Sequence, residues 1–139
     1  NNGTIYQACF NLVGAAGTNS AVSFSDTPTP ISVTTTTSAT SVGITQSNGT
    51  ISVNTVAPPP STGTSLINIG ALDAEAGSMV CVPVTVNDFD GIASLQFSLA
   101  WDPTVLLFTD VQNFNIPDLN AGSFNTTLAA NGSIIRLKV

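Results

Sequence analysis

Apolar and polar residues alternate along most of the chain, which is the period of a β-strand with one buried face. The clearest case is the segment 93–101, where Leu95, Phe97 and Leu99 fall on one face and serine or glutamine on the other. Such a pattern predicts an all-β protein with many short strands. The predicted strands are 4–12, 21–25, 31–35, 42–46, 50–56, 65–69, 79–86, 93–101, 105–111, 124–128 and 133–139.

Glycine, asparagine and proline separate these segments. Asn48-Gly49 predicts a hairpin turn between the two strands that flank it. Pro58, Pro59 and Pro60 cannot all lie inside a sheet, because proline has no backbone N–H to donate to a neighbouring strand. Consecutive prolines favour extended polyproline II structure, so these residues predict a linker.

Composition narrows the function. Charged residues make up 7% of the chain and the net charge is −6, with Arg136 and Lys138 as the two basic residues. A nucleic-acid-binding protein needs a basic surface, so we expect no nucleic-acid partner. The chain has no histidine, which leaves its many serines without the base of a Ser-His-Asp triad. We therefore expect a protein that is not an enzyme, with no catalytic residue and no cofactor.

Acidic residues give no metal-site motif. Asp88 and Asp90 flank Phe89, but the further ligands and the distal glutamate of a calcium loop are missing. We predict a turn with solvated carboxylates there, and solvent exposure for Asp73 and Glu75. No apolar segment approaches the ~20 residues of a membrane-spanning helix, so no membrane span is expected.

Two cysteines, Cys9 and Cys81, do not form a Cys-x-x-Cys pair. A structural disulfide formed in an oxidising compartment is favoured over two free thiols, which indicates a secreted protein. Cys9 falls on the polar face of its strand, and Cys81 also points away from the apolar face of its own. Four Asn-x-Ser/Thr sequences are candidate glycosylation sites, although a chain this rich in these residues also produces them by chance. They begin at Asn2, Asn48, Asn125 and Asn131.

Part of the sequence resembles a known family. Residues 77–108 contain an apolar strand, a glycine, a core strand that ends in Trp101-Asp102-Pro103, and then Leu-Leu-Phe. This order resembles the first half of a cohesin-like domain, a jelly-roll β-sandwich similar to carbohydrate-binding modules. Residues 3–14, 22–24 and 48–53 resemble its second half. The halves therefore occur in the order second half (1–56), proline-rich linker (57–64) and first half (65–139).

This order implies a particular architecture. In the family the first and last strands lie side by side in parallel, so folding both halves together would demand nearly the whole reach of the linker. Seven residues (57–63) span at most about 23 Å. We therefore predict a jelly-roll or immunoglobulin-like β-sandwich in which two half-sandwiches, joined by the proline linker, are completed by neighbouring copies. Folding back into one permuted monomer is the alternative.

Half-sandwiches that complete one another head to tail would generate an open filament. The resemblance thus implies a structural subunit or tandem repeat of an extracellular, cell-surface fibre, with a role in adhesion. Its partners would be identical copies in a homopolymer, and Cys9 of one copy would pair with Cys81 of the next. One alternative is a cohesin-type module that binds a dockerin-like partner. Another is a passive stalk repeat of a large adhesin.

Overall fold

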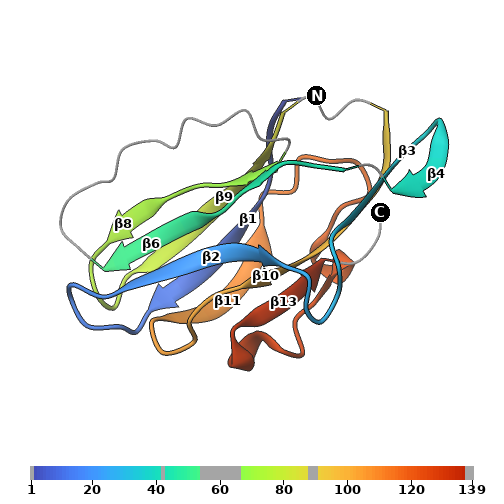
Figure 1. The fold of residues 1–139 in the computed structure, drawn as a ribbon. Helices are drawn as coiled ribbons and strands as arrows, with labels where there is room; N and C mark the ends of the chain where they lie inside the picture. The colour runs from blue at the N-terminus through green and yellow to red at the C-terminus, as the bar shows by residue number, and fades with distance from the viewer. Residues whose placement is uncertain (1, 42, 54–66, 88–90, 137–139) are drawn as a thin grey trace.

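The protein folds into two β-sheets that pack face to face (Figure 1). The computed structural model describes residues 2–41, 43–53, 67–87 and 91–136. The five-stranded sheet has the order β11-β1-β9-β7-β5, and the eight-stranded sheet has the path β12-β13-β10-β2-β6-β8, with β3 beside β10 and β4 beside β3. The first sheet comprises β1 (Gly3–Leu12), β5 (Gln46–Ser47), β7 (Ile67–Ile69), β9 (Met79–Val86) and β11 (Leu106–Gln112). The second comprises β2 (Asn19–Ser25), β3 (Ser32–Thr35), β4 (Ser38–Ser41), β6 (Gly49–Val53), β8 (Leu72–Ala74), β10 (Ile92–Ala100), β12 (Phe124–Asn125) and β13 (Ser133–Arg136). Two 3-10 turns, η1 (Ala121–Ser123) and η2 (Ala129–Asn131), precede β12 and β13.

The all-β sandwich predicted from the alternation is confirmed. In the central strand β10, Leu95, Phe97 and Leu99 are buried between the sheets, while Ser94 and Gln96 face outward. Side chains of successive strand residues point to opposite faces, so one apolar residue in two is enough to fill the core. Trp101, predicted as a core residue, is 6% exposed and packs edge-on against Phe10 at 5.1 Å between ring centroids.

Each sheet combines strands from both halves of the sequence. Strand β1 pairs antiparallel with β9 and β11, and β10 pairs antiparallel with β2. The two halves therefore pair with each other within the single chain that the structure contains, and completion by neighbouring copies stays a prediction. The seven residues counted above are not the whole connection, because thirteen residues (54–66) lie between β6 and β7 in the sequence. A connection of that length reaches roughly 45 Å when extended.

The segment β5–β6 runs parallel to the segment β7–β8, and both segments cross from the five-stranded sheet to the eight-stranded sheet. Strand β5 pairs in parallel with β7 in the first sheet, and β6 pairs in parallel with β8 in the second. The parallel arrangement implied by the resemblance is thus present. The hairpin predicted at Asn48-Gly49 is wrong, because β5 and β6 lie in different sheets and do not pair with each other.

The Asn48-Gly49 pair instead marks the point where the chain crosses between sheets. The Asn48 side chain accepts a hydrogen bond from the backbone N–H of Phe24 at 3.1 Å. A Cβ atom on Gly49 would lie 2.2 Å from the carbonyl oxygen of Gly70. The glycine is therefore required by close backbone approach, which produces the same sequence signal as a turn.

Candidate protein-binding surface

On strands β2, β6 and β10, the outer face of the eight-stranded sheet carries small, uncharged side chains, and Asp73 on β8 lies beside Ser52 of β6. Ser23 on β2 lies opposite Ala100 on β10, and Ala21 lies opposite Thr50 on β6. The next row pairs Asn19 on β2 with Ser52 on β6. We call these residues the hydroxyl face: Asn19, Ala21, Ser23, Thr50, Ser52 and Ala100.

The hydroxyl face follows from the alternation of the sequence. Val22 and Phe24 point into the core, so Ala21 and Ser23 must point out. Serine and alanine at these positions have short side chains, which leave the backbone of the strand accessible. In the sequence, these positions are visible only as residues that alternate with core residues. Their small size and lack of charge were the signal that could have identified the face.

A proline-containing loop bounds the hydroxyl face on one side. Ser98 on β10 is fully buried although it points away from the core, because the loop between β2 and β3 covers it. Its hydroxyl donates a hydrogen bond to the carbonyl oxygen of Thr29 and accepts one from the N–H of Thr29. The same loop separates the β2 and β3 segments that pair along β10. The loop therefore covers β10 at Ser98 and leaves the β2 and β6 rows, and Ala100 on β10, uncovered on this side.

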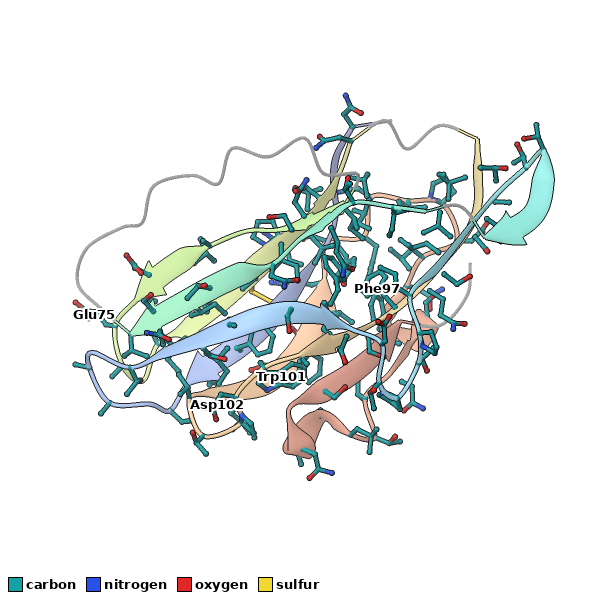
Figure 2. The ribbon with its side chains drawn as sticks, in the orientation of Figure 1. Glu75, Phe97, Trp101 and Asp102 are labelled. Carbon is teal, nitrogen blue, oxygen red and sulfur yellow. A yellow bond between two sulfur atoms is a disulfide. The ribbon has the colours of Figure 1, made fainter. Side chains whose placement is uncertain are left out.

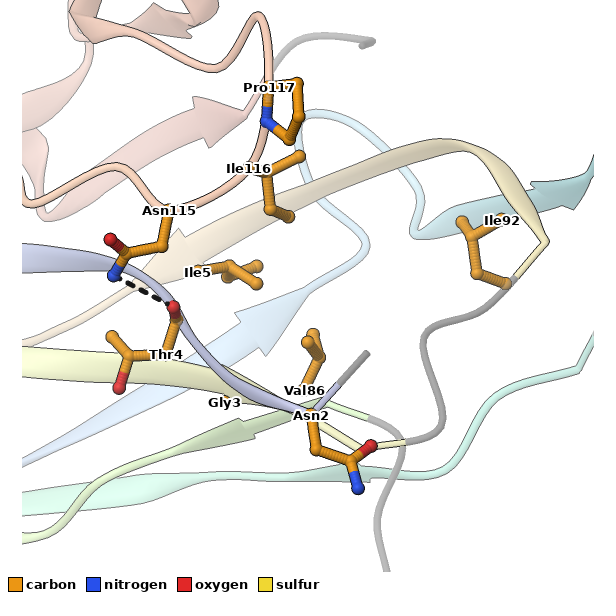
Figure 3. A pocket seen from close by; sticks show the side chains of 9 residues that line it. All are labelled: Asn2, Gly3, Thr4, Ile5, Val86, Ile92, Asn115, Ile116 and Pro117. Carbon is orange, nitrogen blue, oxygen red and sulfur yellow. Dashed lines mark hydrogen bonds between the residues drawn. The ribbon is translucent and has the colours of Figure 1, made fainter.

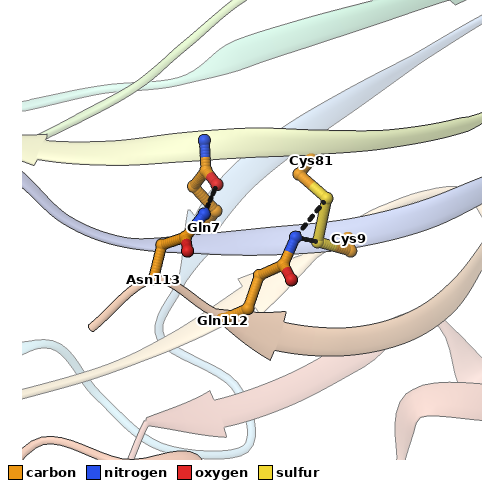
Figure 4. Close-up of a disulfide and its surroundings, with 5 residues drawn as sticks. All are labelled: Gln7, Cys9, Cys81, Gln112 and Asn113. Atoms are coloured by element: carbon orange, nitrogen blue, oxygen red, sulfur yellow. Dashed lines mark hydrogen bonds between the residues drawn. A yellow bond between two sulfur atoms is a disulfide. The ribbon is translucent and has the colours of Figure 1, made fainter.

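On the opposite sheet, Cys9 and Cys81 form a disulfide (Figure 4). The two residues are direct cross-strand partners on β1 and β9. The side-chain amide of Gln112, on β11, lies 3.1 Å from the sulfur of Cys9 and 3.0 Å from that of Cys81. The predicted pairing is present, and here it joins the two halves of one chain. Both cysteines lie on the outer face of the five-stranded sheet, where Cys81 is partly exposed and Cys9 is buried.

A pocket of about 360 Å³ opens at the start of β1 (Figure 3). Its wall is apolar and includes Ile5, Val86 and Ile116, whereas Asn2 and Asn115 lie at its polar rim. The side-chain amide of Asn115 donates a hydrogen bond to the carbonyl oxygen of Thr4. No group in its described lining is charged.

The described acidic residues do not converge. Asp102 is fully exposed, and hydrogen bonds from the side chain and the backbone N–H of Thr104 hold its pKa below the ordinary value of 3.8. Glu75 is exposed in the turn before β9, as predicted, whereas Asp73 is only partly exposed on β8. Asp88 and Asp90 lie outside the described residues. Within the described ranges, no group of three or more histidine, cysteine or acidic residues could hold a metal ion, and no helix is long and apolar enough to cross a membrane.

The remaining candidate residues are scattered. Asn2, Asn48 and Asn131 are exposed, and Asn125 is partly buried with its side-chain oxygen accepting hydrogen bonds from Thr127. Glycosylation at these positions stays a prediction. The linker residues Pro58, Pro59 and Pro60 lie outside the described residues.

The family model of the cohesin domain matches residues 65–138, which is more than half of the chain, so the chain belongs to the cohesin family. Among curated proteins, "Cellulose-binding protein A" of Clostridium cellulovorans is 30% identical over 90 residues. That match covers 64% of this chain, which spans only 4% of the length of the relative. No solved structure matches the chain.

Proposed function

We propose that this chain is a non-catalytic, cohesin-type module that binds a dockerin-like protein partner. The observation that carries the proposal is the family match over residues 65–138. It is supported by the packing of both halves into one sandwich, since a receptor needs a complete fold before its partner arrives. A disulfide that joins the halves supports a secreted, extracellular location.

The hydroxyl face is the proposed contact surface. Specific interfaces bury about 800 Å² on each partner, which requires a broad surface rather than a small cavity. Serine and threonine hydroxyls can both donate and accept hydrogen bonds, and alanine leaves room for a partner's side chains. The pocket at the start of β1 is too small for such an interface.

The test is calorimetric titration of the chain with calcium-loaded dockerin-type domains. Ala21 and Ser23 lie at the centre of the hydroxyl face, so Ala21→Arg places a long charged side chain under the partner. We expect a loss of affinity of at least 100-fold. Gln46→Arg, an exposed position on the five-stranded sheet, is the matched control and keeps full affinity. Equal affinity of Ala21→Arg and the unaltered chain for every domain bound would contradict the assignment of this face.

The order of the halves supports a second candidate function. Two copies could exchange halves across residues 54–66 and build the head-to-tail filament, because the same strand pairings would then form between chains. Electron microscopy of natively purified material separates the two functions. Long fibres with an axial repeat of one sandwich favour the filament, and discrete particles favour the binding module.

A further inference from the structure

The three large apolar side chains that are exposed among the described residues gather at one place. They are Val13 (54% exposed), Met79 (59%) and Leu107 (52%). Asn11 on β1 lies directly opposite Met79 on β9 on one side and opposite Leu107 on β11 on the other. Met79, Asn11 and Leu107 therefore form one row across the outer face of the five-stranded sheet.

Val13 lies next to this row, directly after the end of β1. It is two residues from Asn11 in the chain, and both side chains are exposed. The backbone holds it there, because the N–H of Val13 donates to the carbonyl oxygen of Val105 at 2.9 Å. We call Val13, Met79 and Leu107 the apolar patch. It lies at the opposite end of β1 from the pocket and on the opposite sheet from the hydroxyl face.

Carboxylates border the apolar patch. Asp110 on β11 is exposed and lies opposite Cys9 of β1. Cys9 is two residues from Asn11, which lies opposite Leu107, so Asp110 belongs to the neighbouring row on the same face. Glu75 belongs to the exposed turn before β9, in which the N–H of Gly77 donates to the carbonyl oxygen of Leu12 at 2.8 Å. Asp102 lies at the same end of the sandwich (Figure 2). The strands of this sheet contain no lysine or arginine, so the charged groups beside the patch that are described here are carboxylates.

We propose that the apolar patch is a second protein-docking surface, and that its occupant is a segment combining aliphatic and basic side chains. Exposed aliphatic side chains that cluster beside polar residues are typical of interaction sites. The acidic border selects the charge of the partner, because opposite charges at the rim of an interface favour association and like charges oppose it.

The same border disfavours a second copy of this chain as the occupant. A symmetric contact would bring Glu75 and Asp110 of one copy close to those of the other. The chain has a net charge of −6, and the strands of this sheet contain no basic residue that would offset the repulsion between these carboxylates.

The test uses two short synthetic peptides, one alternating valine with lysine and the other alternating valine with glutamate. Nuclear magnetic resonance titration of the unaltered chain should show saturable shifts, confined to residues around the apolar patch, with the lysine peptide alone. The double variant Met79→Thr/Leu107→Thr should bind that peptide at least tenfold more weakly. Threonine suits exposed strand positions, so the fold is retained. Glu75→Gln/Asp110→Asn should weaken binding several-fold, whereas Gln46→Thr on the same sheet should not change it.

Three results would overturn the proposal. The lysine peptide would fail to saturate, the shifts would map elsewhere, or the affinity of Met79→Thr/Leu107→Thr would equal that of the unaltered chain. Concentration-dependent self-association that this double variant abolishes would assign the patch to a second copy instead. None of these results tests the proposed function, which is tested separately by the affinity of Ala21→Arg for dockerin-type domains.

Discussion

Removing the disulfide should reveal how much of the stability depends on tying the two halves together. The bridge joins Cys9 and Cys81 across a sequence separation of 72 residues, and that loop includes the connection between the halves. Cross-linking a loop of this length lowers the entropy of the unfolded chain by an amount equivalent to about 4 kcal/mol at room temperature. Because folded domains are stable by only about 5–15 kcal/mol, the bridge supplies a large part of the total.

The experiment compares the unaltered chain with Cys9→Ala/Cys81→Ala by urea denaturation. With a denaturant dependence of about 2 kcal/mol per molar urea, the midpoint should fall by roughly 2 M. The control is Gln112→Leu, which removes the amide above the sulfur atoms and keeps the bridge, and its midpoint should fall by much less. A shift below about 0.5 M in the double variant would refute the reasoning. A midpoint of the unaltered chain that rises with protein concentration would show that the halves are joined between chains.

Four further predictions concern single positions. Phe97→Ala should cost about 3–5 kcal/mol by urea denaturation, because this side chain is fully buried and packs edge-on against Phe24 at 5.1 Å. Gly132→Ala should destabilise by more than about 2 kcal/mol, since its φ is 78° and a Cβ would lie 2.3 Å from the carbonyl oxygen of Trp101. Gly17→Ala should cost only about 1 kcal/mol, because its φ is also positive but the added Cβ meets open space. By carbon-detected pH titration, the pKa of Asp102 should lie below 3.8 and rise in Thr104→Val. A folded pKa that is lowered means that this carboxylate stabilises the fold above its unfolded pKa, and that the contribution is lost as pH falls through the folded pKa.

The strands that the sequence predicted well are those with strict alternation. The predicted segments 4–12, 79–86 and 93–101 agree with β1, β9 and β10 to within one residue at either end. In these segments, large apolar residues recur at every second position and are buried between the sheets, which leaves a direct trace in the sequence. The faces of Cys9 and Cys81 followed from the same alternation.

Features that depend on distant parts of the chain were predicted less well. Strand β8 (Leu72–Ala74) was missed, because its pairing with β6 is what holds it extended. The role of Asn48 depends on contacts with residues far along the chain. The apolar patch was also missed, since Val13, Met79 and Leu107 come together only when three strands pair.

The central claim is that one chain completes its own sandwich and so forms one whole cohesin-type module. Sedimentation equilibrium of the unreduced chain over a wide range of concentrations tests it most directly. The structure predicts a single species of 14.1 kDa at every concentration. A series of masses that grows with concentration, and that disappears when residues 54–66 are lengthened by a flexible insert, would instead show that neighbouring copies complete each other.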